Sequence, residues 1–365
     1  MNARKATRLG ALGGLLAVSA LAAGAAAAPA IAAPSAKPAA PAADHSYRHG
    51  LVPTVQAEQS LRKLQSANPD VQRATSSKTL VYGGGVDGIG VTSGKEKVYI
   101  VFWGTQWGTS STNSSGNLTF SNDSLGASNR VQQMFKGLGT GGEAWSGVMT
   151  QYCDGSLVSK GATSCSSSAA HVAYPTGGGT LAGVWYDNSV SAPSAATQAQ
   201  IGSEAVKAAG HFGNTSASSN RYAQYVVFSP KGANPDSYKT GGFCAWHDYN
   251  KDLGVSSSYG DIALTNLPYL SDVGASCGAG FVNSGSNLDG YTIVEGHEYA
   301  ETITDQNPAG GWTASSGQEN ADECAWISSG QGASANVAMG NGSYPMQSTW
   351  SNDTNRCDIS HVTVT

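Results

Sequence analysis

Charged residues are scarce in this chain. Asp, Glu, Lys and Arg make up only 12% of the 365 residues, and the formal net charge is −5. Proteins that bind nucleic acid use clusters of Lys and Arg to neutralise phosphates. The sequence has no such cluster, so we exclude nucleic acid as a partner.

Long apolar runs are also missing, except at the N-terminus. Arg4, Lys5 and Arg8 precede the apolar run LGALGGLLAVSALAAGAAAA, and small residues follow it. This order is typical of a secretory signal peptide, which we place at 1–33. No adjacent Arg pair is present, which favours the general secretory route. Removal of the segment lowers the 20 cationic residues to 17, against 25 acidic ones, a formal charge of −8. We expect a secreted, extracellular protein without a membrane anchor.

Cysteine is sparse, and no C-x-x-C pair exists, which disfavours a zinc cluster built from thiolates. An even number of cysteines in an exported chain indicates disulfides. Fifteen pairings are open to six cysteines, and we favour pairing between sequence neighbours. The expected bridges are Cys153 with Cys165, Cys244 with Cys277, and Cys324 with Cys357.

Several well-known catalytic motifs are absent. The chain has no G-x-S-x-G nucleophile elbow and no G-x-x-x-x-G-K-[ST] phosphate loop. Its glycine clusters YGGGVDGIG and PTGGGTLAG lack the strand and helix context of a dinucleotide fingerprint. A serine hydrolase and a nucleotide-dependent enzyme are therefore disfavoured.

The composition divides the chain into three parts. After the signal peptide, 34–76 form a linker and a helical arm, which begin with the Pro/Ala-rich tether PSAKPAAPAADH. The arm has helical spacing over 54–67, with Val55, Leu61 and Leu64 on one side. It is either a propeptide or an arm packed on the body. We expect 77–365 to form a single α/β extracellular domain.

The body alternates strand and helix patterns. Helices are expected over 127–138, 194–212 and 292–305, and strands over 97–104, 181–187, 222–230 and 260–268. Such alternation predicts a layered α/β fold with a mostly parallel sheet and flanking helices. The C-terminal part is expected to be loop-rich and stapled by disulfides.

The motif that suggests chemistry is Glu295-Gly-His-Glu-Tyr-Ala-Glu301. Side chains four positions apart share a helix face, so His297 and Glu301 can converge on one metal ion. Glu298 would lie where it can act as general base. This arrangement follows the logic of the H-E-x-x-H zinc motif, with a carboxylate in place of the second histidine. The alternative is a solvated charged face.

Further carboxylates follow in Glu319-Asn-Ala-Asp322-Glu323-Cys324. Glu319 or Asp322 is a candidate third metal ligand. These acids could instead cap a turn or bind a structural calcium ion, which prefers oxygen ligands. They could also pair with Glu298 as the two carboxylates of a glycosidase.

His247 lies in the segment Phe-Cys-Ala-Trp-His-Asp, which we interpret as a loop fixed by Cys244. Such loops commonly build active sites, so His247 is a third ligand or a catalytic, transition-state-stabilising group. A hydrogen-bonded structural histidine is the alternative. Tryptophans flank these segments and serve either core packing or substrate stacking: Trp103, Trp107, Trp246, Trp312 and Trp326.

Several blocks in 81–325 resemble, in the same order, the Exordium-like (phosphate-induced) extracellular proteins. They are YGGGVDG before KVYIVFWGTQW, then CAWH, then DGYTIVEGHEYAETITDQNPAGGW leading to ENADEC. The chain departs by having C-A-W-H for C-G-W-H and Asn-Ala before Asp322. The resemblance implies an extracellular location and no defined reaction. It singles out the same polar positions: His247, His297, Glu298, Glu301, Glu319 and Asp322.

Together these patterns predict a secreted zinc metallopeptidase that acts on extracellular peptide. His297 and Glu301 would be ligands, Glu319, Asp322 or His247 would complete the shell, and Glu298 would be the base. One alternative is a non-catalytic, cell-wall-associated protein with a structural or calcium-binding acidic cluster. The other is a carboxylate-dependent glycosidase acting on cell-wall polymer.

Overall fold

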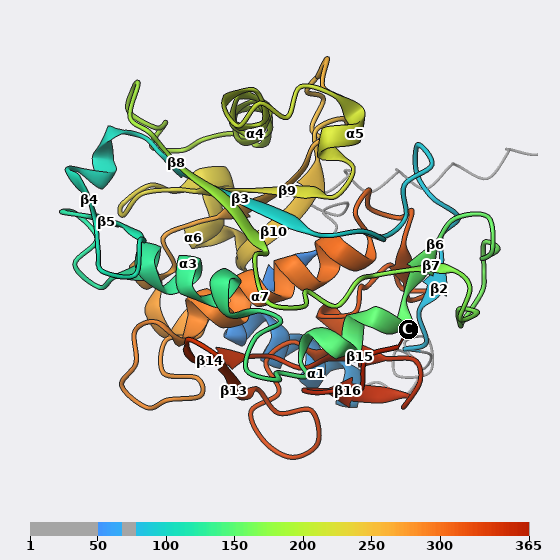
Figure 1. The fold of residues 1–365 in the computed structure, drawn as a ribbon. Helices are drawn as coiled ribbons and strands as arrows, with labels where there is room; N and C mark the ends of the chain where they lie inside the picture. Colours follow the sequence, from blue (N-terminus) through green and yellow to red (C-terminus); the bar gives the residue numbers. More distant parts are fainter. Residues whose placement is uncertain (1–49, 68–77, 365) are drawn as a thin grey trace, which may run out of the picture. The chain divides into compact units, whose positions relative to one another are not determined.

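A six-stranded sheet runs through the computed structural model, which describes residues 50–67 and 78–364 (Figure 1). The expected signal peptide and the Pro/Ala-rich tether lie outside the described residues. The strand order is β1-β10-β11-β9-β3-β8. Their bounds are β1 Leu51–Pro53, β3 Lys97–Trp103, β8 Leu181–Asp187, β9 Ala223–Phe228, β10 Phe243–Tyr249 and β11 Ala263–Leu267.

The strands from β11 to β8 are parallel to one another, whereas β10 and β1 are antiparallel to their neighbours. This confirms the mixed α/β class and the mostly parallel sheet. Consecutive side chains point to opposite faces of a strand. In β3 and β9, Val101 and Val227 therefore pack on one face, and Ile100 and Val226 pack on the other.

One face of the sheet is covered by α4, Gln198–His211, and we call it the α4 face (Figure 1). The helix begins with a capping box in which Thr197 accepts a hydrogen bond from the Gln200 backbone and Gln200 reciprocates. Ile201 and small alanines of α4 pack against Val101 and Leu264. Alanine has the highest helix propensity and allows close approach to the strands.

The opposite face is covered by α7, Asp289–Thr304, and by α3, Ala127–Gly137. We call it the α7 face. Every residue of α7 is buried, because the sheet lies on one side of the helix and strand β14 packs against another. Gly296 makes this packing close, since a Cβ there would lie 2.6 Å from Met346 Cε. The helix therefore carries its polar residues into the interior.

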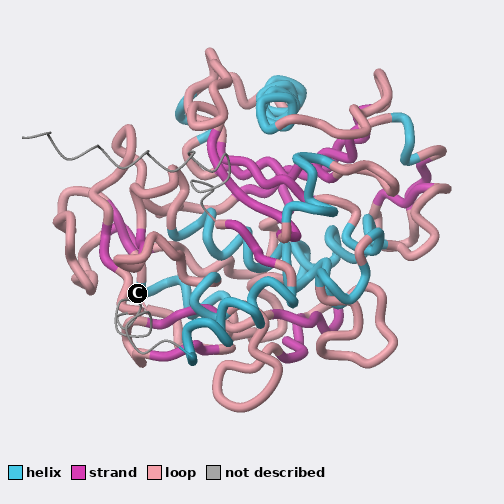
Figure 2. The backbone as a smooth tube through the Cα atoms, turned by 180° about the vertical axis from the view of Figure 1, so that it is seen from behind, coloured by secondary structure: helices cyan, strands magenta, loops and turns pink. Residues whose placement is uncertain are grey.

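Short elements and loops make up most of the rest (Figure 2). The strand pairs are β2 Val81–Tyr82 with β12 Trp312–Thr313, β4 Ser110–Thr112 with β5 Leu118–Phe120, β6 Cys153–Asp154 with β7 Ala170–His171, β13 Ala335–Met339 with β14 Gly342–Met346, and β15 Thr349–Ser351 with β16 Arg356–Asp358. The remaining α-helices are α1 Val55–Ala67, α5 Ala217–Asn220 and α6 Tyr238–Gly241. The 3-10 helices are η1 Thr105–Trp107, η2 Ser146–Gln151, η3 Pro235–Ser237, η4 Leu270–Asp272, η5 Gly274–Cys277 and η6 Asp322–Cys324.

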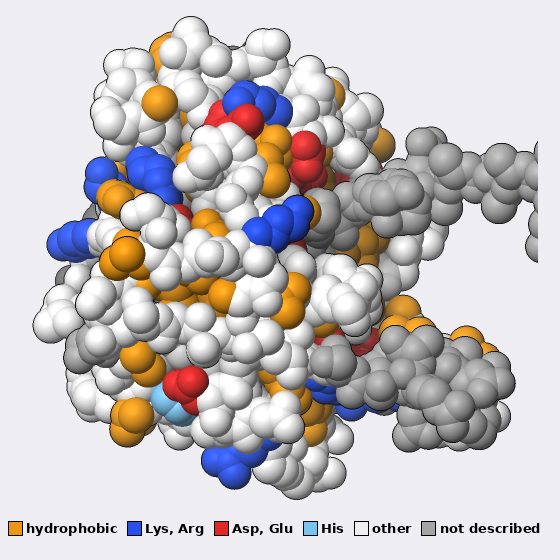
Figure 3. Space-filling view, turned by 90° about the vertical axis from the view of Figure 1, so that its right-hand side faces the viewer, with side chains coloured by type: hydrophobic (Ala, Val, Ile, Leu, Met, Phe, Trp, Pro, Cys, Tyr) orange, Lys and Arg blue, Asp and Glu red, His pale blue; other side chains and the backbone are white. Residues whose placement is uncertain are grey.

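All six cysteines form disulfides, with the neighbour pairing that the sequence favours. The bridges join Cys153 to Cys165, Cys244 to Cys277 and Cys324 to Cys357. Disulfides persist in oxidising compartments, so they fit an extracellular protein. Within 50–67 and 78–364, no helix is long and apolar enough to cross a bilayer. The face drawn in Figure 3 carries only scattered charged side chains among neutral ones.

The structure corrects two local expectations and adds one element. The segment around His247 is strand β10 rather than a loop, and it is buried throughout because β1 and β11 flank it. Helix α1 forms as predicted, but its apolar side is not buried: Leu61 is 42% exposed and Leu64 67% exposed. Strand β1 was not predicted, since its three residues carry no periodic signal.

Candidate metal centre

The centre forms where α7 faces β10 and η6. His297, Glu298 and Glu301 lie on α7 and are fully buried. His297 and Glu301 share one face of the helix, as their spacing predicts. His247 comes from β10, and its side chain points to the α7 face because Trp246 before it points to the α4 face. Asp322 begins η6. Segments far apart in the sequence thus meet here.

The imidazole of His297 is oriented by Gln347. The amide nitrogen of Gln347 donates to the carbonyl oxygens of Ala321, at 2.8 Å, and Ser348, at 3.2 Å. Its oxygen therefore faces His297 Nδ1, at 3.1 Å, and accepts the proton that Nδ1 carries. With Nδ1 protonated, a neutral His297 presents the lone pair of Nε2 to the centre, as a metal ligand must.

Two carboxylates face that lone pair. Glu301 Oε1 lies 3.0 Å from His297 Nε2, and Asp322 Oδ1 lies 3.5 Å from it. The Asp322 backbone N–H donates to Glu301 Oε1 at 2.9 Å, which holds the two acids together. Ligand atoms from these three residues all lie within 4.8 Å of one another. A cation at their centre would remove the repulsion between the facing lone pairs.

A second group of potential ligands shares Glu301. His247 Nε2 lies 3.7 Å from Glu301 Oε2, and the group His247, Glu298 and Glu301 also gathers within 4.8 Å. Glu319 does not join either group. Its Oε2 lies 3.1 Å from His247 Nε2, so Glu319 binds that imidazole. The structure therefore brings all six predicted residues together, and it places Glu319 on the same His247 nitrogen that faces Glu301 rather than beside His297.

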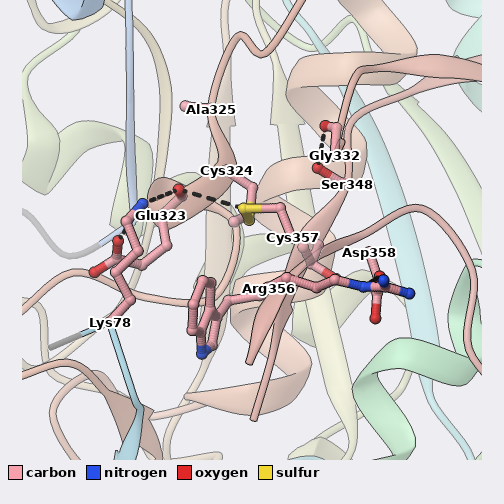
Figure 4. Close-up of a disulfide and its surroundings, with 12 residues drawn as sticks. Lys78, Glu323, Cys324, Ala325, Gly332, Ser348, Arg356, Cys357 and Asp358 are labelled. Atoms are coloured by element: carbon pink, nitrogen blue, oxygen red, sulfur yellow. Dashed lines mark hydrogen bonds and ion pairs between the residues drawn. A yellow bond between two sulfur atoms is a disulfide. The ribbon is translucent and has the colours of Figure 1, made fainter. Parts of the chain in front are cut away.

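The segment that supplies Glu319 and Asp322 is fixed by a disulfide and an ion pair (Figure 4). Cys324, at the end of η6, is bridged to Cys357. Lys78 Nζ lies 3.0 Å from the Glu323 carboxylate and 2.8 Å from its carbonyl oxygen. These bonds leave little freedom to η6, so Asp322 is held against α7.

Buried carboxylate oxygens without hydrogen-bond partners indicate that the centre could hold a cation. None of the described residues donates a hydrogen bond to either oxygen of Glu298 or to Glu301 Oε2. A buried ionised carboxylate costs several kcal/mol unless it is paired or binds a metal. Two imidazoles and several carboxylates are also an acceptable donor set for a transition metal. The residues present therefore fit a metal ion, whose identity the donor set leaves open.

The protonation behaviour agrees with this interpretation. Burial and the nearby Asp322 together raise the pKa of Glu301 to about 7, although His297 acts in the opposite direction. Burial also raises the pKa of Glu298 and Glu319 well above the usual range of a carboxyl group. Burial alone would lower the pKa of His297, but Glu301 and Asp322 outweigh it and raise that pKa well above its usual value. Each shift expresses a demand for positive charge at the centre.

No significant match came from the comparisons with protein-family models, with curated proteins or with solved structures. The resemblance to Exordium-like proteins is therefore still a prediction.

Two polar residues at the centre escaped the sequence analysis. Gln347 follows a β14 strand in a segment without a motif, and only the fold brings its amide to His297. Glu295 was part of the helix motif without a role. It is fully buried, and burial raises its pKa well above the usual range. The five tryptophans near these segments are at most 6% exposed, which identifies them as core rather than a substrate-stacking surface.

Proposed function

We propose that this protein is an exported zinc-dependent hydrolase of the peptidase type. The observation that carries the proposal is the convergence of His297 Nε2, Glu301 and Asp322 in a buried centre. Beside them lies the Glu298 carboxylate, which has no hydrogen-bond partner within 50–67 and 78–364. Export is supported by the N-terminal signal pattern and by the three disulfides.

Among the metals that this donor set admits, we propose zinc. Calcium and magnesium take oxygen ligands almost exclusively, whereas an imidazole nitrogen that is oriented by Gln347 suits zinc. One histidine with carboxylates leaves a coordination position open, as catalytic zinc sites do. Bound zinc would supply a Lewis acid that polarises a substrate carbonyl and lowers the pKa of water.

The remaining roles fall to the chain's own groups. We assign to Glu298 the role of accepting a proton from water and passing it to the leaving amine, because neither of its oxygens has a hydrogen-bond partner among the described residues and it groups with His247 and Glu301. Glu319 holds the imidazole of His247 through Nε2. His247 then lies against Glu301 on the side opposite His297, where a charged intermediate would need stabilisation.

The test replaces Glu298 with Gln, which keeps the size of the side chain and removes its basicity. We expect Glu298→Gln to retain zinc and to lose peptide hydrolysis by at least ~100-fold, the usual contribution of a general base. Glu96→Gln is the matched control, because Glu96 is also a buried glutamate but belongs to neither ligand group. Peptide hydrolysis that survives in Glu298→Gln would refute the assigned mechanism. Release of reducing sugar by a chelator-treated protein would point to a glycosidase instead.

A further inference from the structure

The segment that begins at Gly50 runs directly over the candidate metal centre. Gly50 is buried, and a Cβ on it would lie 1.8 Å from His247 Cδ2 and 2.6 Å from Glu301 Oε2. Its φ of +55° also belongs to the left-handed region that favours glycine. Backbone therefore occupies the space next to two of the groups that the proposed reaction needs.

The same segment covers the edge of the sheet. β1 pairs antiparallel with β10, with Leu51 opposite Trp246 and Val52 opposite Ala245. On its other side β10 pairs with β11, so without β1 it would be an edge strand. An exposed strand edge beside a reactive centre is a template for an extended peptide, which adds as a further strand.

Polar contacts hold much of this segment in place. Trp326 Nε1 donates to the Pro53 carbonyl oxygen at 2.7 Å, the Thr54 N–H donates to Gly242 O at 2.8 Å, and Arg62 donates to the Ala325 carbonyl oxygen. The leucines of α1 stay largely exposed. A cavity of about 280 Å³ lies between α1 and the 318–327 segment, and Asp322 lines it. Removal of the segment would still expose Val52, which is fully buried in the core, and the partly buried Leu51 and Val55.

We propose that the edge of β10 is a binding site for an extended polypeptide, and that 50–67 are its intramolecular occupant. The occupant keeps the metal centre covered, with a glycine at the one position where a side chain would collide with it. This inference rests on the proposed function for the identity of the substrate. Of the two interpretations of the helical arm, a propeptide or an arm packed on the body, this inference favours the propeptide.

The experiment starts from the folded full chain with a recognition sequence for a specific protease inserted between residues 71 and 72. After cutting, the released N-terminal fragment is separated by gel filtration, and a labelled synthetic peptide of residues 50–67 is titrated. We expect the peptide to bind the cut chain and not the uncut chain. A peptide with Gly50→Leu should bind at least ten-fold more weakly. Absence of peptide binding to the cut chain would overturn the proposal.

Hydrolysis separates this inference from the proposed function. If the cut chain cleaves a peptide substrate at least ten-fold faster than the uncut chain, and the 50–67 peptide inhibits it, both stand. If the peptide binds but neither form hydrolyses any substrate, the binding edge stands and the proposed function fails. Equal hydrolysis by both forms, without peptide binding, would refute the inference alone.

A second variant needs no cutting. In the uncut chain, Gly50→Ala should lift β1 from β10 and speed the hydrogen exchange of the paired β1 amides at least ten-fold. The matched control is Gly254→Ala, because Gly254 has a φ of +68° but no atom within 4 Å of the added Cβ among the described residues. Unchanged exchange in Gly50→Ala would contradict the close contact over His247.

Discussion

The two faces of the sheet bury polar groups in different ways. On the α4 face, Asp187 lies buried but has Lys207 and Ser189 as partners, and despite burial these bonds lower its pKa to about 2. On the α7 face, Glu298 has no hydrogen-bond partner among the described residues, and its pKa is raised. The first face thus pairs Asp187 within the protein, although Glu204 of α4 keeps one buried oxygen without a hydrogen-bond partner among the described residues, and burial raises its pKa to about 8. On the second face the gathered histidines and carboxylates could hold a cation, and we place the proposed function there.

Metal removal should give the largest effect, and only on the α7 face. A ligand that binds the folded state at a thousand times its Kd stabilises it by about 4 kcal/mol. We therefore expect a chelator to lower the melting temperature of the protein, measured by calorimetry, and restored zinc to reverse the change. In His297→Ala the chelator should have almost no further effect. An equal loss in that variant would place the metal elsewhere.

A cavity-creating substitution on the α4 face should destabilise the protein equally with and without metal. Ile201 is fully buried against the sheet, so Ile201→Ala should cost about 3 kcal/mol of unfolding free energy through lost burial and a cavity. Denaturant titration with and without chelator measures this. We expect the same loss in both conditions. A loss that disappears after chelation would mean that the two faces are coupled.

Glu96 is a lone buried acid near α7, where it lines a small cavity with Tyr299 and Thr302. Burial raises its pKa from the usual 4.5 to about 8. The folded state therefore holds a proton that the unfolded chain releases. The contribution of protonated Glu96 to the free energy of unfolding is complete below pH 4.5 and is lost as the pH rises towards 8.

Glu96→Gln should remove this dependence. We expect the variant to be more stable than the parent by roughly 2 kcal/mol at pH 8, and about equal to it at pH 4.5. Urea unfolding at the two pH values measures it. A parent chain whose unfolding free energy did not fall relative to the variant between these pH values would show that Glu96 has a partner.

The smallest effect is expected at the start of α4. Thr197 caps the helix, so Thr197→Ala should cost about 1 kcal/mol and leave metal binding unchanged. Thermal unfolding and a zinc titration on the same sample give both values. Weakened zinc binding would contradict the independence of the two faces.

The elements with long periodic patterns were predictable from the sequence. The strand at 181–187 agrees with β8, and α3 and α7 lie within a few residues of their expected bounds. Strand β10 was missed, because the segment was interpreted as a loop fixed by Cys244. Its flanking strands bury these polar side chains, and the sequence carries no local sign of that context.

For the centre, the helical spacing of His297 and Glu301 predicted their convergence, because i and i+4 side chains share a face. The position of Asp322 was one of several alternatives, since it depends on how η6 returns to α7. Gln347 and Gly50 were out of reach. Their contacts with His297 and His247 join segments separated by 50 residues or more and follow no motif.

Elemental analysis of the purified full chain tests the central claim most directly. The account predicts about one zinc per chain, lost in His297→Ala and in Glu301→Gln and retained in Glu96→Gln. A chain that carries no metal after growth in zinc, binds none on titration, and keeps the same melting temperature in chelator would contradict it.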